Sequence, residues 1–189
     1  MKQKLFKAYL LLVKLVIRVN SGVKLGDASV RGFPLFRVRG SLQLGKGSRL
    51  NSGLYWNPIG GDARMCIVVD AQAKLSVGDN FAASNCSIFC RQSILIGKNV
   101  MVGGGARIWD TDFHDLSIKK RMLPLDRGKS KPIVIGDNVF VGANSIILKG
   151  VVIGNNAVLG AGSVVSCNVP SHEVWAGNPA RFIRKLDDC

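Results

Sequence analysis

The side chains best suited to proton transfer lie in a polar stretch from Asp110 to Pro132. His114 lies within it, and a neutral imidazole, with an ordinary pKa of about 6.5, can take a proton from a hydroxyl group and later return it. Asp112 and Asp115 flank this histidine, and either carboxylate can hold the imidazole in one tautomer. The sequence does not choose between them. The alternative interpretation is an exposed loop histidine with acidic neighbours.

This polar stretch interrupts a periodic sequence that must position it. From Ile135 to Val169 an aliphatic residue recurs every six residues, usually followed by Gly, and the fifth place of each six is small or β-branched. A period of six fits neither a helix face nor a simple alternating strand. It is typical of a parallel β-solenoid, in which each six supplies one short strand and one corner, with Gly or Asn in the strained corner conformations. The six aliphatic positions are Ile135, Val141, Ile147, Ile153, Leu159 and Val165.

The same period is weaker before the polar stretch. It begins at Leu25, slips several times, and is interrupted by turn sequences, among them residues 55–61. A solenoid tolerates such slips because each coil contacts only its neighbours. We therefore predict one all-β solenoid over residues 23–170 with an excursion loop at 110–132. Residues 171–189 are predicted to form a turn and a short tail with a brief helix at Arg181–Leu186.

Residues 1–22 are predicted to form a basic amphipathic helix, because the stretch from Lys4 to Val19 lacks Gly and Pro and gathers its cations in one arc of the helical wheel. It is too short, and Lys14 too central, for a comfortable membrane span of about 20 residues. Two interpretations remain open. The helix either lies on the inner leaflet of a membrane or packs as a cap on the solenoid or on a neighbouring subunit.

Charge and cysteine content narrow the function. The formal net charge is +14, and residues 1–40 hold nine Lys or Arg against Asp27 alone, whereas the repeats from Ile133 to Val169 are neutral. A basic end matches an anionic lipid surface better than nucleic acid bound along the body. The five cysteines form no CxxC pair, and without a secretory signal a reducing cytosol is the simpler expectation. Cys86 and Cys90 are predicted to line the solenoid rather than to form a reactive pair.

The run IGDNVFVGANSIILKGVVIGNNAVLGAGSVV, the TDFHD segment before it and AGNPARFIRKL after it resemble the hexapeptide-repeat acyltransferases, most of all the sugar O-acetyltransferases. The resemblance covers Val77 to Leu186. It implies a left-handed parallel β-helix, a homotrimer with active sites between neighbouring solenoids, and acetyl-CoA as the donor. Handedness is taken from the resemblance, because the period alone does not set it.

The resemblance also assigns roles to residues. It places the catalytic base at His114, and it aligns Asn85 with an active-site asparagine that helps to hold the acceptor. An ordinary corner asparagine is the alternative for Asn85. The implied donor contacts, with the two arginines near the nucleotide phosphates, are Gly142, Ala143, Ala161, Ser166, Cys167, Arg181 and Arg184.

The expected function is direct acetyl transfer to a sugar hydroxyl, in a ternary complex, on a precursor of a bacterial surface polysaccharide. The alternatives are N-acyl transfer to an amino sugar and a non-catalytic solenoid that binds a partner. A zinc-dependent carbonic anhydrase on the same scaffold needs three histidines, and the chain has only His114 and His172, so no metal is expected. We expect a cytoplasmic protein, with peripheral contact at the inner face of the membrane if the basic helix binds lipid, and no nucleic-acid partner.

Overall fold

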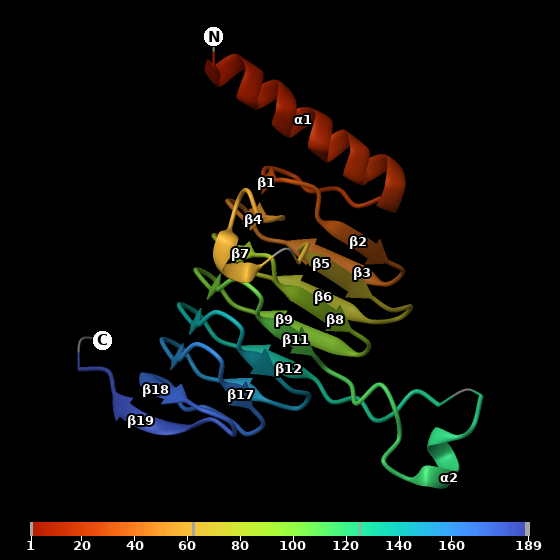
Figure 1. Ribbon diagram of the computed structural model, residues 1–189, viewed down its shortest axis with the longest axis vertical. Coiled ribbons are helices and arrows are strands. Elements are labelled where there is room, and N and C mark those ends of the chain that lie inside the picture. The colour runs from red at the N-terminus through yellow and green to blue at the C-terminus, as the bar shows by residue number, and fades with distance from the viewer. Residues whose placement is uncertain (1, 62, 125, 188–189) are drawn as a thin grey trace.

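A computed structural model describes residues 2–61, 63–124 and 126–187, with side chains described from Leu5 onward. Met1 of the predicted helix, and the last two residues of the predicted tail, which include Cys189, lie outside this part. Figure 1 shows a helix at one end of a stack of short strands, a loop projecting from the lower part of the stack, and a C-terminal hairpin at the other end. The stacked strands form the predicted parallel β-solenoid.

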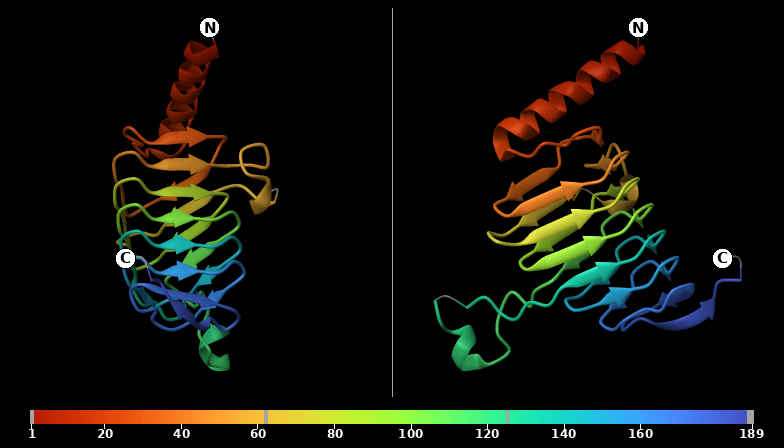
Figure 2. Two further views of the ribbon diagram at one scale, coloured as in Figure 1. Left: turned by 90° about the vertical axis from the view of Figure 1, so that its left-hand side faces the viewer. Right: turned by 180° about the vertical axis from the view of Figure 1, so that it is seen from behind.

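Three parallel sheets make the three sides of the solenoid, and the chain visits them in turn on every coil (Figure 2). Sheet A runs in the order β1-β4-β7-β10-β13-β16-β18-β19, sheet B in the order β2-β5-β8-β11-β14-β17, and sheet C in the order β3-β6-β9-β12-β15. The strands of sheet A are β1 (Ser29–Arg31), β4 (Arg49–Asn51), β7 (Ala82–Ser84), β10 (Met101–Val102), β13 (Phe140–Val141), β16 (Val158–Leu159), β18 (Glu173–Ala176) and β19 (Arg181–Lys185). Those of sheet B are β2 (Leu35–Val38), β5 (Cys66–Val69), β8 (Ser87–Cys90), β11 (Arg107–Trp109), β14 (Ile146–Ile147) and β17 (Val164–Val165). Those of sheet C are β3 (Ser41–Leu44), β6 (Lys74–Val77), β9 (Ser93–Ile96), β12 (Ile133–Ile135) and β15 (Val152–Ile153).

The aliphatic position of each six points into the core, as the period predicts. All six of these residues are at most 1% exposed, and the small or β-branched residue four places later is buried beside each of them. Strand register explains the alignment, because Val141 lies opposite Val102 on one side and Leu159 on the other. Each coil therefore adds one layer to a continuous apolar column, which is the main source of the solenoid's stability.

The corner conformations fall on the fourth residue in five of the six repeats, the exception being Asn168. Asn138, Asn144 and Asn156 have φ of 58°, 59° and 60°, and glycine takes the corresponding place in other coils. Along one corner the asparagine side chains form a ladder, in which the amide of Asn138 donates to Asn156 at 2.8 Å and Asn156 lies 3.2 Å from Nε2 of His172. His172, with φ of 61°, thus ends a structural ladder at the last coil.

Gly142, at the second place of its six, has a different reason to be glycine. Its φ is not positive, but a Cβ at this position would lie 2.5 Å from the backbone nitrogen of Ala161 in the next coil. The close approach of stacked coils excludes a side chain here. The predicted link between repeat glycines and strained dihedrals therefore holds for the fourth position, whereas Gly142 is required by stacking distance.

The N-terminal helix α1 (Lys2–Ser21) lies across the first coil, where it contacts β1 and β2. Val13 and Ile17 are buried against the solenoid, and Nζ of Lys14 donates to the carbonyl of Gly26 at 3.0 Å. The capping role that the sequence left open is therefore confirmed for one face of this helix. A second excursion, with a short 3-10 helix η1 (Pro58–Gly60), projects beside sheet A.

The predicted helix at Arg181–Leu186 is wrong. Residues 181–185 form strand β19, which pairs antiparallel with β18, and β18 pairs parallel with β16. The edge of sheet A offers unpaired backbone groups to the chain that leaves the last coil. The apolar Phe182 and Ile183 suit a strand on this edge as well as a helix, so the open edge decides the outcome.

Candidate functional site

The excursion that carries His114 leaves the solenoid from a fixed point, the buried carboxylate of Asp110. Its Oδ1 accepts from the backbone N–H of Arg91 at 2.7 Å, and its Oδ2 accepts from the N–H groups of Gln92 and Ser93, both at 2.8 Å. These three amides lie in the turn between β8 and β9 and at the first residue of β9, in the preceding coil. Three hydrogen bonds to one buried carboxylate fix the place where the excursion begins.

The excursion is a hairpin rather than an irregular loop. Thr111 and Ser130 form an antiparallel bridge, and the N–H of Asp112 donates to the carbonyl of Lys129 at 2.9 Å. The far end carries a short helix, α2 (Ile118–Arg121), which stands clear of the solenoid in both views of Figure 2. The two-stranded stem therefore brings residues 110–114 beside residues 126–131, which are remote in the sequence.

An aromatic cluster holds the stem against sheet B. The ring of Phe113 meets that of Phe89 edge to face at 4.8 Å and lies 6.1 Å from that of Trp109. The guanidinium of Arg91 lies 5.5 Å from the centre of the Phe89 ring and 5.7 Å from that of Phe113, and it also donates to the carbonyl of Arg127. Aromatic pairs and cation–π contacts each contribute about 0.5–1.5 kcal/mol beyond burial, so the base of the hairpin is well fixed.

His114 comes next and meets a carboxylate that the sequence did not point to. Its Nδ1 lies 3.0 Å from Oδ2 of Asp126, whose side chain is 6% exposed. The other oxygen of Asp126 accepts from the N–H groups of Asp115 and Gly128 at 2.9 and 3.0 Å. Burial raises the pKa of this carboxyl, but the two amides and His114 outweigh it and leave the pKa below its ordinary value.

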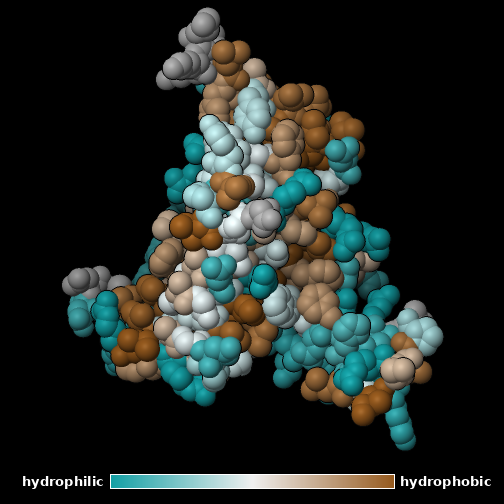
Figure 3. All heavy atoms as spheres, viewed as in Figure 1, coloured by the Kyte–Doolittle hydropathy of each residue, from teal (hydrophilic) through white to brown (hydrophobic). Residues whose placement is uncertain are grey.

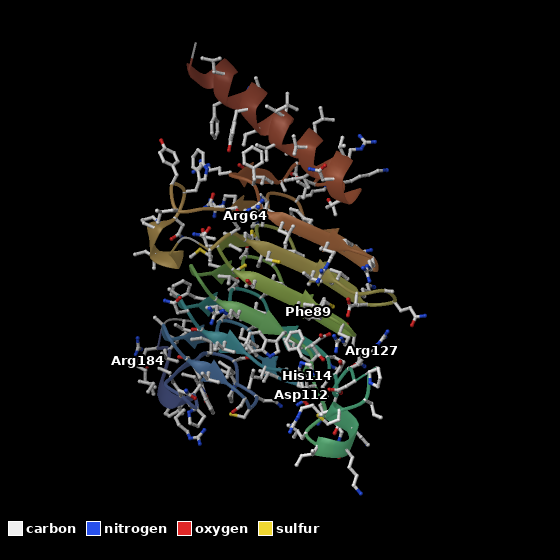
Figure 4. The ribbon with its side chains drawn as sticks, turned by 45° about the vertical axis from the view of Figure 1, so that its right-hand side comes forward. Arg64, Phe89, Asp112, His114, Arg127 and Arg184 are labelled. Atoms are coloured by element: carbon white, nitrogen blue, oxygen red, sulfur yellow. The ribbon has the colours of Figure 1, made fainter. Side chains whose placement is uncertain are left out.

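This arrangement sets the tautomer of His114. An ionised carboxylate only accepts hydrogen bonds, so Nδ1 carries the hydrogen, and in the neutral imidazole Nε2 then keeps a free lone pair. The imidazole is 70% exposed in the single chain, and Figure 4 shows it on the flank of the solenoid near Phe89 and Asp112. A held Nδ1 and an accessible Nε2 are what a general base needs.

Gly128 packs against the backbone of His114, beside the contact between His114 and Asp126. Its φ is +62°, and a Cβ at this position would lie 2.7 Å from the nitrogen and 2.8 Å from the oxygen of His114. Both the backbone conformation and the close approach exclude a side chain. This glycine therefore keeps the backbone of His114 within reach of Asp126.

The two carboxylates that the sequence suggests as partners of His114 make other contacts. Oδ1 of Asp112 lies 2.7 Å from Nζ of Lys149, on the corner of the next coil, and so ties the hairpin to the solenoid. The carboxylate of Asp115 accepts from the N–H of Ser117 at 2.8 Å. Neither contacts the imidazole. Proximity in sequence suggested them, whereas the hairpin brings in Asp126 from twelve residues away.

Asn85 lies apart from His114 on the corner between β7 and β8, where it is 2% exposed. Its Oδ1 accepts from the N–H of Gly53 at 2.7 Å, and its Nδ2 donates to the carbonyl of Asn57 at 2.8 Å. The side chain thus holds the excursion around η1 in place. A direct role of Asn85 toward an acceptor stays a prediction.

The predicted donor contacts fall on three parts of the structure. Gly142, Ala143 and Ala161 stack on the corner between sheets A and B, whereas Ser166 and Cys167 lie exposed on the corner between sheets B and C. The His114 hairpin leaves from that second corner, so sheet B lies between the two sets. The exposed Arg181 and Arg184 lie on β19, and Figure 4 shows Arg184 far across the molecule from His114.

Among the described residues, no three histidine, cysteine or carboxylate side chains gather in a way that could hold a metal ion. Cys86 and Cys90 are buried free thiols, as predicted. Burial raises the pKa of each to about 12.

Comparison with known proteins places this geometry in a family. Residues 132–167 match the hexapeptide repeat of succinyl-transferase. The structure of a maltose O-acetyltransferase from Clostridium difficile 630 is 30% identical, with a TM-score of 0.56, and the match covers 82% of this chain and 72% of that one. A Dictyostelium discoideum protein, provisionally named an acetyltransferase, is 45% identical over 119 residues, which are 62% of this chain and 61% of that protein. The 2,3,4,5-tetrahydropyridine-2,6-dicarboxylate N-acetyltransferase of Halalkalibacterium halodurans is 42% identical over 93 residues, which are 49% of this chain and 33% of that protein.

The chain therefore belongs to the hexapeptide-repeat acyltransferases, and its fold is their left-handed parallel β-helix. It spans between about half and 61% of the length of three curated relatives that it matches.

Proposed function

We propose that this chain transfers an acetyl group from acetyl-CoA to a sugar hydroxyl, with His114 as the general base. One observation carries the proposal: Nδ1 of His114 is held by Asp126, and Nε2 is left accessible, on the hairpin of a hexapeptide-repeat acyltransferase. The maltose O-acetyltransferase among its relatives supports a sugar hydroxyl as the acceptor. A precursor of a bacterial surface polysaccharide, made in the cytoplasm where acetyl-CoA is available, is the acceptor class that we propose.

The chemistry follows from the tautomer. Nε2 of His114 takes the proton of the acceptor hydroxyl while its oxygen attacks the thioester carbonyl. The tetrahedral intermediate then collapses, the C–S bond breaks, and the leaving thiolate takes the proton from Nε2. Asp126 stabilises the imidazolium between these steps without becoming protonated. Neither step needs an acyl-enzyme.

The donor would lie against the outer face of sheet B near the C-terminal coils. The small residues Gly142, Ala143 and Ala161 border this face on one side, and Ser166 and Cys167 border it on the other. A thioester between these corners can approach the hairpin, and the small side chains leave room for pantetheine and for hydrogen bonds to the backbone. Arg181 and Arg184 on β19 are our proposed contacts for the nucleotide phosphates.

In the single chain the far end of the His114 hairpin presents uncovered apolar side chains. Leu116, Ile118, Met122 and Leu123 at the far end are each more than half exposed. Apolar side chains grouped on a projecting hairpin are typical of an interface. We propose that a neighbouring protomer of a homotrimer covers them and lowers the exposure of His114.

The test is acetyl transfer from acetyl-CoA to a panel of sugars, followed by the mass shift of the acceptor. His114→Ala should fold, bind CoA in calorimetry and lose at least about a hundredfold in rate, the usual contribution of a general base. His172→Asn is the matched control, because asparagine suits its positive φ and continues the ladder from Asn156. Near-normal turnover of His114→Ala would overturn the assignment, and absence of CoA binding by the unmodified protein would favour a non-catalytic solenoid.

N-acyl transfer to an amino sugar is the second candidate. The relative from Halalkalibacterium halodurans is named as an N-acetyltransferase, and the same base can take a proton from an ammonium or amine. Matched acceptors that differ only in a hydroxyl or an amino group, assayed side by side, distinguish the two reactions. A preference for the amine of at least about tenfold in kcat/KM would favour N-acylation.

A further inference from the structure

The helix α1 has a second apolar face that does not touch the solenoid. Its inner face contributes Val13 and Ile17 to the core, yet Leu5, Leu12, Leu15 and Val19 lie on the opposite side and are each more than half exposed. At 100° per residue these four fall within an arc of roughly 80°. Figure 3 shows hydrophobic side chains gathered along this helix at the end of the molecule. A helix that only caps the stack needs no such second stripe.

Cations border this stripe. Lys7, Lys14 and Arg18 lie along one side of it on the helical wheel, and α1 contains no acidic residue. Beside them a groove of about 510 Å³ opens between α1 and residues 23–26, with Leu11 and Leu15 in its wall and Lys24 on its border. Apolar side chains flanked by lysine and arginine are the pattern of helices that lie in the interface of a lipid bilayer.

We propose that the outer face of α1 docks on an anionic lipid bilayer, with Leu12 and Leu15 among the acyl chains and Arg18 and Lys24 at the phosphates. Charge complementarity decides the occupant. A second copy of the same face would bring its own cations against these cations, whereas anionic headgroups neutralise them. No helix within the described residues is long and apolar enough to cross a bilayer.

Docking through α1 would also set the orientation of the molecule on the bilayer. Because α1 lies across the first coil, a bilayer bound to its outer face meets one end of the solenoid and leaves the sheets and the His114 hairpin clear of the membrane. The cationic first 40 residues would then lie near the lipid and the neutral coils farther from it. The uneven distribution of charge along the chain thus gains a physical reason.

Vesicle sedimentation tests the proposal with the full-length protein. We expect binding to vesicles of phosphatidylcholine with 30% phosphatidylglycerol, little binding to phosphatidylcholine alone, and weaker binding at about 0.5 M salt, where charges are strongly screened. The double variant Leu12→Gln, Leu15→Gln should bind at least about tenfold more weakly, because it removes two side chains from the apolar contact. Arg18→Gln with Lys24→Gln should lose about fivefold per cation.

Leu95→Gln is the matched control, because this half-exposed leucine lies on sheet C, away from the helix. It should bind vesicles as the unmodified protein does. Equal sedimentation with both lipid compositions, or unchanged binding by the double leucine variant, would overturn the proposal. So would a loss of oligomer mass in that variant by light scattering, because it would assign the stripe to a second copy of the chain.

Discussion

The coils from Ile133 to Val169 and the hairpin at 110–132 are fixed in opposite ways. In the coils each residue type repeats a contact made in the coil above, so the buried column and the asparagine ladder are stabilised many times over. In the hairpin each contact is made once: Asp110 to three amides, Phe113 to two rings, Asp126 to His114. Stability therefore lies mainly in the repeated part, whereas the part that does not repeat holds His114, the base that we propose for proton transfer.

The largest expected effect is on the coils. Ile147→Ala, at a position with no exposure, should lower the free energy of unfolding by about 2–5 kcal/mol. Lys119→Ala, on the exposed short helix α2 of the hairpin, is its counterpart and should change stability by less than about 0.5 kcal/mol. Urea unfolding followed by circular dichroism measures both. Equal losses would show that the hairpin folds as part of the stack.

Two glycines sharpen the comparison. Gly128→Ala places a Cβ against the backbone of His114 and should lower kcat/KM by about a hundredfold, the cost of a displacement of about 1 Å in the proposed base. The strain should displace the hairpin and leave the coils folded, so Tm should fall less than in a variant of the coils. Gly136→Ala places a Cβ 2.8 Å from the backbone nitrogen of Asn155 and should lower stability by about 1–3 kcal/mol. Activity and melting curves of both variants decide the matter. A loss of Tm in Gly128→Ala that matches Gly136→Ala would contradict the division.

Asp126→Asn tests the partner of the base. A neutral amide makes a hydrogen bond to Nδ1 about half as strong as that of a carboxylate, so kcat should fall about tenfold while the fold persists. Asp112→Asn is the matched comparison and should affect activity less, because that carboxylate contacts Lys149. Equal losses of kcat from both substitutions would favour Asp112 again as a partner of His114.

The lowered pKa of Asp126 also predicts how its contacts in the hairpin depend on pH. Its stabilising contacts are fully present above about 3.9, the ordinary aspartate pKa, and are lost as pH falls through the lower folded value. The amide resonances of Asp115 and Gly128, followed by NMR, should therefore shift only below about pH 3.9. A shift centred above that value would contradict the hydrogen-bonded, ionised carboxylate.

The smallest effect concerns thiol reactivity. Cys86 and Cys90 lie in the coils, with the pKa of each raised to about 12 by burial, whereas Cys167 is exposed on a corner. A thiol-reactive reagent at pH 8 should modify Cys167 in the folded protein. It should reach Cys86 and Cys90 only after unfolding in urea. Peptide mass spectrometry reads the difference. Rapid labelling of Cys86 or Cys90 in the folded protein would show that the coils open readily.

The sequence predicted the repeated part well, because a contact made in every coil leaves the same residue type at the same place six times. The period predicts Ile135 and Val141 in the core for this reason, and both are buried. The partner of His114 could not be found in this way. Asp126 meets it only because the stem pairs Asp112 with Lys129, and nothing periodic marks that register. The turn-forming Asp126 and Gly128, separated by a single residue, are the available signal.

The prediction of a helix in the C-terminal tail is wrong for a related reason. Whether Phe182 and Ile183 continue in a helix or a strand depends on the open edge of sheet A, a property of the folded stack rather than of the local sequence. Both faces of α1 were visible as apolar residues, but only the structure separates the face that packs on the first coil from the face that does not.

The antiparallel pairing of β19 also decides how copies of this protein can assemble. A parallel ladder that ended bare would invite the next molecule to continue it, and head-to-tail growth into fibres would follow. Here the last rung of sheet A turns back on itself with a shift of register, and at the other end α1 lies over the first rung. Because β19 closes the edge of sheet A and α1 covers β1 and β2, head-to-tail stacking of the columns is disfavoured, and the homotrimer that we propose would form through their long sides.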